Sequence, residues 1–252
     1  MPSKTNKPKR DPNRSGSLKI GDTWNAITII ALSQNNPLKA IAEFVENSID
    51  AKARHITIIR GKKKGEYYLK VVDDGDGIED FRYVATHIGD SIKRKLKQRG
   101  AEGIQGEFGI GLLSFWTVGG ALTLTSTPEN GATQKMTLVK NNPGYNITPV
   151  RSLIDTKGTH LHIQPLLPGI RQLTGEKIQY YLSSELRDRI SQSGVEIKIF
   201  DRTARKELTV EPRRFTGKLL HDLPALKNPF GEIYSEIYLE EPSTENKIGL
   251  YR

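Results

Sequence analysis

Three polar side chains are spaced so that they could act together on one ligand. Glu43 is followed four residues later by Asn47, and three residues after that by Asp50. In a helix this spacing places the side chains on one face, one turn above another. Two carboxylates and an amide suit a metal ion and a water molecule, because hard divalent cations prefer oxygen ligands. The alternative is an ordinary solvated face, since most surface helices have a polar side.

A helix is also predicted by the apolar residues around these side chains. They recur at helical spacing through residues 38–54: Leu38, Ile41, Ala42, Val45, Ile49 and Ala53. This pattern is typical of an amphipathic helix with one buried face. Pro37 favours a start at this point, because a residue of the first turn does not need its N–H group. The three polar side chains are therefore expected on the other face of a helix.

A second segment combines a carboxylate with two glycines. Asp73, Gly75 and Gly77 follow an expected strand over residues 67–72. Alternating glycines indicate that the backbone turns sharply or approaches another group closely. A carboxylate at the end of a strand accepts hydrogen bonds from a buried donor. An ordinary acidic turn is the alternative, whereas the spacing of an EF-hand calcium loop is absent.

A third segment has the composition of a phosphate-binding loop. Gly106, Gly109 and Gly111 precede an apolar run over residues 112–116. Exposed N–H groups where a helix begins attract phosphate. The chain contains neither a P-loop string nor a Rossmann dinucleotide fingerprint. Residues 89–103, which include Lys93, are polar and strongly basic, which favours a mobile lid rather than a packed element. Their charges suit a bound polyphosphate. The alternative is that these lysines are simply solvated.

Composition limits the classes of function. The 252 residues carry a formal net charge of +9, which favours acidic partners such as nucleotides or nucleic acids. Cysteine is absent, which excludes disulfides and cysteine-ligated zinc and fits a reducing compartment, cytoplasmic or nuclear. No apolar run has the length of a membrane span, so we expect no membrane partner. Residues 1–20 are expected to form a basic arm. The arm either binds nucleic acid or a partner subunit, or it is a solubilising tail.

The order of the expected elements indicates an α+β protein. Hairpins are expected in place of strictly alternating strand–helix units, which suits an α+β arrangement of layers. Strands are expected over residues 55–60, 67–72, 121–127, 133–140, 148–152 and 160–164. After residue 167 we expect a helix over 174–193, capped by Thr174 and ended by Gly194, and strands over 195–200 and 233–239.

Four signals in one order resemble the GHKL superfamily of ATPases, which have the Bergerat fold. They are Glu43-xxx-Asn47-xx-Asp50-Ala51, Asp73-x-Gly75-x-Gly77, Gly106-xx-Gly109-x-Gly111 and Gly158-Thr159. The string EFVENSIDAKA is similar to the MutL and microrchidia versions, and GEFGIGLLS to the heat-shock chaperone and type IIB topoisomerase versions. The resemblance covers residues 22–164. It implies a two-layer α/β sandwich with a mixed, mainly antiparallel sheet and helices on one face. It also implies that nucleotide lies between the helices and the sheet.

The resemblance also implies roles for the residues of the helix. Glu43 corresponds to the general base that deprotonates the attacking water, and Asn47 to the ligand of Mg²⁺. Asp50 corresponds to a residue that either contacts nucleotide or supports the pocket. Lys93 resembles a lid lysine near the phosphates.

The other residues correspond to the two ends of the nucleotide. Asp73 matches the carboxylate that accepts from the adenine amino group, and Thr159 the residue that supports it, often through water. Gly75 and Gly77 let the backbone pass close to the base. The glycines at positions 106, 109 and 111 match the loop around the phosphates.

The expected organisation is an arm over residues 1–20, an ATP-binding domain over 21–167 and a second region over 168–252. The second region either begins a transducer-like domain or completes the first one. The expected function is Mg-dependent ATP binding and hydrolysis that drives homodimerisation or conformational change in a larger protein, with DNA as a candidate partner. The alternative is a nucleotide-gated binding module or switch with negligible turnover.

Overall fold

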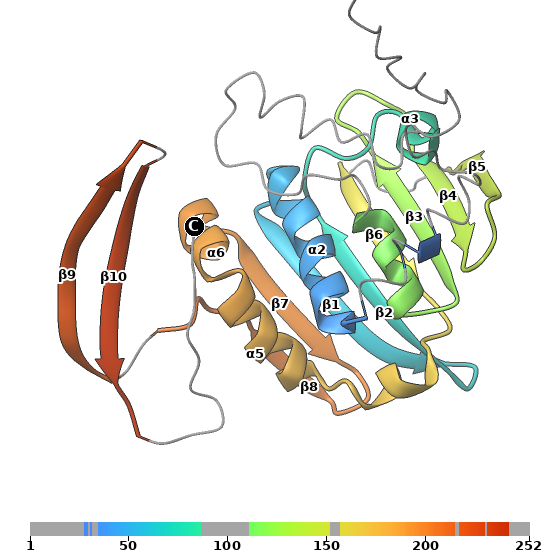
Figure 1. Ribbon diagram of the computed structural model, residues 1–252. Coiled ribbons are helices and arrows are strands. Elements are labelled where there is room, and N and C mark those ends of the chain that lie inside the picture. Colours follow the sequence, from blue (N-terminus) through green and yellow to red (C-terminus); the bar gives the residue numbers. More distant parts are fainter. Residues whose placement is uncertain are drawn as a thin grey trace, which may run out of the picture.

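The computed structural model describes residues 28–29, 31, 35–86, 111–151, 157–214, 217–229 and 231–241. Its centre is an eight-stranded sheet in the order β5-β4-β3-β6-β2-β1-β7-β8 (Figure 1). The strands are β1 His55–Lys63, β2 Glu66–Asp73, β3 Ala121–Thr127, β4 Gln134–Val139, β5 Tyr145–Pro149, β6 Gly158–Ile163, β7 Glu196–Asp201 and β8 Lys206–Thr209. All neighbouring pairs are antiparallel except β1 and β7.

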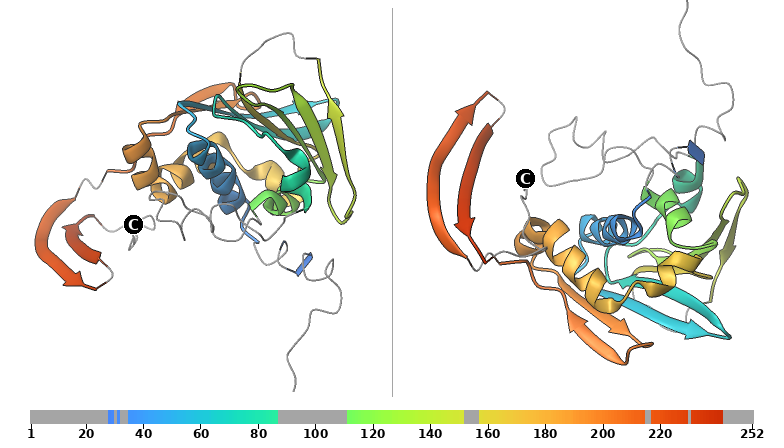
Figure 2. Two further views of the ribbon diagram at one scale, coloured as in Figure 1. Left: turned by 90° about the horizontal axis from the view of Figure 1, so that it is seen from above. Right: turned by 60° about the horizontal axis from the view of Figure 1, so that its bottom comes forward.

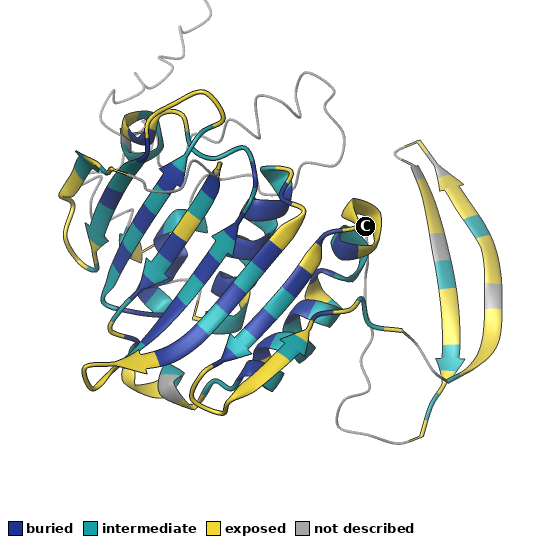
Figure 3. Cartoon of the chain, turned by 180° about the vertical axis from the view of Figure 1, so that it is seen from behind, coloured by how far each residue is buried: buried dark blue, intermediate teal, exposed yellow. Residues whose placement is uncertain are grey.

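Helices cover one face of the sheet, and the α+β sandwich predicted from the sequence is confirmed (Figure 2). They are α2 Pro37–Asp50, α3 Phe81–Thr86, the 3-10 helices η1 Gly111–Thr117 and η2 Pro168–Gln172, α5 Gly175–Glu185 and α6 Arg187–Ser193. The view from behind in Figure 3 shows that no described helix covers the opposite face. Among the helices of the described ranges, none has the length and apolar composition that a membrane crossing needs.

Helix α2 begins and ends close to where the sequence predicted. Pro37 is its first residue, and the Asn36 side chain accepts a hydrogen bond from the N–H of Leu38 at 3.0 Å. This bond satisfies one of the free donors of the first turn. The apolar stripe is buried against the sheet, with Ile41 and Val45 fully enclosed. Burial of that stripe fixes the rotation of the helix about its axis, and hence the direction of its polar side chains.

One expected helix is divided in the structure, and one expected strand is displaced along the chain. The expected helix over residues 174–193 starts at the Thr174 cap and ends at Gly194, but it is divided at Leu186 into α5 and α6. The apolar pattern could not reveal this break, because both halves bury their Leu and Ile side chains. Strand β5 lies three residues earlier than expected and ends at Pro149, which has no N–H to continue the pairing.

The residues after position 167 extend the sheet of the preceding ones. Strand β7 pairs in parallel with β1, from His55 opposite Glu196 to Arg60 opposite Asp201. The position expected for the division, after residue 167, thus lies within the stretch of chain that forms this one sheet. Strands β9 Lys218–Asn228 and β10 Gly231–Leu239 form a separate two-stranded sheet. The division into domains, with a second region over residues 168–252, stays a prediction.

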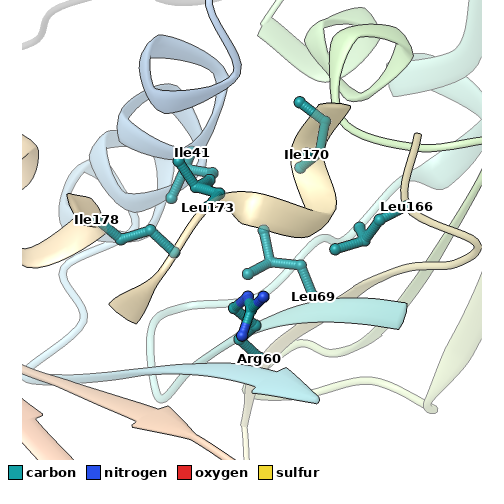
Figure 4. Close-up of a pocket in the computed structure, with 7 residues that line it drawn as sticks. All are labelled: Ile41, Arg60, Leu69, Leu166, Ile170, Leu173 and Ile178. Atoms are coloured by element: carbon teal, nitrogen blue, oxygen red, sulfur yellow. The ribbon is translucent and has the colours of Figure 1, made fainter. Parts of the chain in front are cut away.

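A buried ion pair joins β1 to β7. The Arg60 guanidinium donates to both carboxylate oxygens of Asp201 at 3.0 and 3.2 Å, and both side chains are buried. Burial opposes the charge of Asp201, but N–H donors of Ala204 and Gly175 together with Arg60 lower its pKa. Figure 4 shows Arg60 near apolar side chains that include Leu69 and Ile178.

Substitution of Arg60 tests how strongly this pair holds β7 to the sheet. Arg60→Met should lower the free energy of unfolding by about 3–5 kcal/mol, because it leaves a buried carboxylate without its cation. Urea denaturation measures the change. The control is Lys206→Met, which breaks an exposed pair with Glu176 and should lower the free energy of unfolding far less, because water screens exposed charges. Equal losses of unfolding free energy in the two variants would show that the buried pair stabilises the protein no more than the exposed pair does.

Candidate functional site

The carboxylate of Asp73 is fixed by hydrogen bonds from three parts of the chain. Its Oδ2 accepts from the Ser48 hydroxyl of α2 at 2.8 Å. Its Oδ1 accepts from the N–H of Gly75 at 3.0 Å and from the N–H of Thr159 at 3.1 Å. Asp73 is only 9% exposed. The last residue of β2 is therefore a buried acceptor between the helix layer and the sheet.

Burial is the main electrostatic effect on this carboxylate. It raises the pKa of Asp73, because a buried charge loses its hydration. The hydrogen bonds from Ser48, Gly75 and Thr159 act in the opposite direction, and the negative charge of Asp74 adds to the rise. A buried carboxylate of this kind gains from an additional hydrogen-bond donor, which a ligand can supply.

The backbone around Asp73 is packed too closely for side chains. A Cβ atom at Gly158 would lie 2.1 Å from the carbonyl oxygen of Asp73, and one at Gly75 would lie 2.7 Å from the carbonyl oxygen of Ala51. Gly77 has a φ of +77°, and a Cβ there would lie 2.5 Å from the carbonyl oxygen of Thr127. Glycine is required at these positions by close approach and, at Gly77 and Gly158, also by a positive φ.

Thr159 supports this arrangement through its backbone as well as its side chain. Its N–H bonds Asp73 directly, and its hydroxyl lies 3.0 Å from the Ser126 hydroxyl. Ser126 in turn accepts from the N–H of Ile78 at 2.8 Å, which ties the glycine turn to β3. Thr159 and Asp73 lie opposite each other in the paired strands β6 and β2.

A second cluster on α2 consists of Glu43 and Asn47. Glu43 is half-buried and Asn47 is exposed, and both border Gly111 at the start of η1. A Cβ atom at Gly111 would lie 3.2 Å from Glu43 Oε2 and 3.7 Å from Asn47 Nδ2. The absent side chain lets the backbone of Gly111 pass close to a carboxylate and an amide, and groups of these kinds can bind a phosphate and a cation.

Tyr181 of α5 contributes a neutral hydroxyl to the surroundings of Glu43. Burial raises the pKa of Tyr181 to about 12, and the carboxylates of Glu185 and Glu43 add to this effect. The hydroxyl therefore keeps its proton at neutral pH.

The carboxylate of Asp50 contacts helix α6. It forms an ion pair with Arg189 of α6, and Arg189 also lies 3.8 Å from Glu46. The exposed fractions of the three side chains are 8%, 13% and 13%. A carboxylate in the last turn of a helix faces the negative end of the dipole, so a cation is favourable there. Of the two roles implied for Asp50, this geometry favours support of the pocket.

Three of the expected site residues lie outside the described part of the chain: Lys93, Gly106 and Gly109. Sequence reasoning also missed three residues that the structure adds: Ser48, Ser126 and Arg189. Ser48 follows Asn47 directly in the sequence. An assignment of the buried positions on α2 could therefore have identified it as a candidate site residue. No local signal points to Ser126 or Arg189, because their partners come from distant parts of the sequence.

Comparison with known families matches the part of the chain that carries these residues. Residues 35–151 match the family model described as "Histidine kinase-, DNA gyrase B-, and HSP90-like ATPase". This range contains α2, the Asp73 turn and the start of η1, whereas Thr159 lies after it.

Two curated proteins are similar to the same chain at moderate identity. One is the mismatch repair endonuclease pms1 of Dictyostelium discoideum, 29% identical over 136 residues, which are 52% of this chain and 13% of that protein. The other is the DNA mismatch repair protein MutL of Halalkalibacterium halodurans, 32% identical over 137 residues, which are 52% of this chain and 20% of that protein. The matched region thus spans a fifth or less of either relative.

The ion pair of Asp50 leads to a test of its role. Asp50→Asn should lower the free energy of unfolding by about 1.5–3 kcal/mol, the range for a hydrogen bond to a charged group. The ATP affinity of the folded protein should change less than twofold. Asp188→Asn is the matched control, because its ion pair with Arg187 is more exposed. A tenfold loss of ATP affinity in Asp50→Asn, without such a loss in Asp188→Asn, would indicate that Asp50 contacts the nucleotide.

Proposed function

Because this chain belongs to the GHKL superfamily of ATPases, we propose that it binds ATP with Mg²⁺ between α2 and the sheet and hydrolyses it. The observation that carries the proposal is the placement of two unlike clusters along one helix. Ser48 bonds the buried carboxylate of Asp73, whereas Glu43, about one turn before Ser48, and Asn47 border Gly111. This placement supports a site with an acceptor for the base in one cluster and polar groups for the phosphates in the other.

Asp73 is the proposed partner of the adenine amino group. A carboxylate accepts from an amino donor, whereas guanine presents a carbonyl at the equivalent place. Gly75 and Gly77 give the base close access to the backbone, and Thr159 holds Asp73 in position. Gly111 is proposed to contact the phosphates together with Gly106, Gly109 and Lys93.

Glu43 is the proposed general base. Its carboxylate accepts a proton from water while the water oxygen attacks the γ-phosphorus. The bond from that phosphorus to the bridging oxygen breaks, which releases ADP and phosphate. The Asn47 amide oxygen is the proposed protein ligand of Mg²⁺, and the position of the Asn47 side chain beside Gly111 and Glu43 supports this role. Bound Mg²⁺ would neutralise charge on the phosphates.

Nucleotide-driven dimerisation and action on DNA belong to the same proposal. The names of the two relatives refer to mismatch repair, and the net charge of +9 suits a polyanionic partner. A switch that holds ATP with negligible turnover is the second candidate function. Glu43 favours hydrolysis, because a switch without turnover has no need of a base.

Glu43 and Asn47 should separate turnover from binding. Glu43→Ala should reduce single-turnover hydrolysis by about a hundredfold or more, with ATP affinity nearly unchanged, because a base acts mainly in the transition state. Asn47→Ala should lose Mg²⁺-dependent ATP binding as well as turnover, because a metal ligand acts in both states. If closure is driven by ATP, Glu43→Ala should accumulate as the ATP-bound dimer.

The measurement pairs equilibrium ATP binding in the presence of Mg²⁺ with single-turnover hydrolysis. Glu207→Ala is the control, an exposed glutamate of the edge strand β8 that should leave both quantities unchanged. Hydrolysis at the parent rate by Glu43→Ala would refute the base assignment and favour the switch.

The basic arm gives a test of DNA binding. Residues 1–14 contain five lysines and arginines, so their removal should weaken retention of duplex DNA in gel shifts. Binding by the full chain should also fall steeply as salt increases, because counterions are released from the phosphates. Unchanged retention after removal of the arm would identify it as a tail without a role in DNA binding.

A further inference from the structure

The hydrogen bonds of Asp73 leave little freedom for a ligand. A carboxylate oxygen accepts about two hydrogen bonds. Oδ1 already accepts two, from the N–H groups of Gly75 and Thr159. Oδ2 has one described donor, the Ser48 hydroxyl. An additional donor from a ligand therefore has its place on Oδ2, beside Ser48.

Ser48 has one hydroxyl hydrogen and two acceptors within reach. Its oxygen lies 2.8 Å from Asp73 Oδ2 and 3.2 Å from the carbonyl oxygen of Phe44 in the preceding turn. The hydrogen can go to only one of them. The carboxylate is closer, and bonds to ionised acceptors are stronger than bonds to neutral ones. Ser48 therefore donates to Asp73 rather than to its own helix.

Burial makes this bond a constraint on the carboxylate. Ser48 is 5% exposed, so the hydroxyl is held by the packed stripe of α2. The two donors on Oδ1 fix one side of the carboxylate, and Ser48 on Oδ2 fixes its rotation about the Cβ–Cγ bond. Without Ser48, Oδ2 would lose its described protein donor, and the carboxylate plane could turn.

We propose that Ser48 is a positioning residue for base recognition, which orients Asp73 Oδ2 toward the amino group of a 6-aminopurine. The inference rests on the proposed function, because it assumes that the site takes ATP. It adds that part of the selectivity for adenine comes from a side chain of α2. Nucleotides without a 6-amino group should gain nothing from Ser48.

The test compares two nucleotides on the same variants by calorimetry. The ligands are ATP and purine riboside triphosphate, which lacks the 6-amino group. Ser48→Ala should weaken ATP binding about tenfold, near the lower end of the range for a hydrogen bond to a charged group. Its affinity for purine riboside triphosphate should change less than twofold. Ser183→Ala is the control, because that hydroxyl bonds only a carbonyl of its own helix among the described contacts.

A double-mutant cycle shows whether Ser48 acts through Asp73. In the Asp73→Asn background, Ser48→Ala should change ATP affinity less than twofold. Independent, additive losses would overturn the inference, and so would equal losses for the two nucleotides, which indicate a general effect on the pocket. Unchanged ATP affinity in Ser48→Ala would overturn it as well. Failure of the parent protein to bind ATP would refute the proposed function, and the inference with it.

Discussion

The structure depends on the hydrogen bonds that converge on one buried carboxylate. Asp73 ends the central strand β2 and receives donors from α2, from the glycine turn and from β6. These bonds connect the helix layer with the sheet where an ordinary core would have only apolar contacts. A buried carboxylate is costly unless it is hydrogen-bonded. The same requirement that stabilises the fold thus also prepares an acceptor for a ligand.

The second constraint is how closely the backbone passes around this carboxylate. Gly158 and Gly77 occupy places where a Cβ atom would meet backbone atoms, which have little freedom to move. Rigid surroundings keep the acceptor in one place and reduce the entropic cost of binding. Beside Glu43 and Asn47, the absent side chain of Gly111 also permits a close approach, because a Cβ atom there would lie 3.2 Å from Glu43 Oε2. Glycine therefore serves close packing in both clusters.

Local patterns predicted much of this arrangement, and long-range contacts account for the rest. Apolar spacing and Pro37 located α2, and the strand before Asp73 placed that carboxylate at a strand end. Ser48 escaped notice because its partner lies 25 residues away and its position belongs to the buried side of the helix. Asp50 and Arg189 are 139 residues apart, and Arg60 and Asp201 are 141 residues apart. No local periodicity encodes such pairs, so the parallel joining of β7 to β1 could not be foreseen.

The central claim is that α2 and Asp73 hold the two ends of one nucleotide. A crystal structure with Mg²⁺ and a non-hydrolysable ATP analogue tests this most directly. The account predicts the adenine amino group within hydrogen-bonding distance of Asp73 Oδ2, and Mg²⁺ on the side-chain oxygen of Asn47 with the γ-phosphate facing Glu43. An analogue bound elsewhere, or one whose base leaves Asp73 without a new donor, would contradict it.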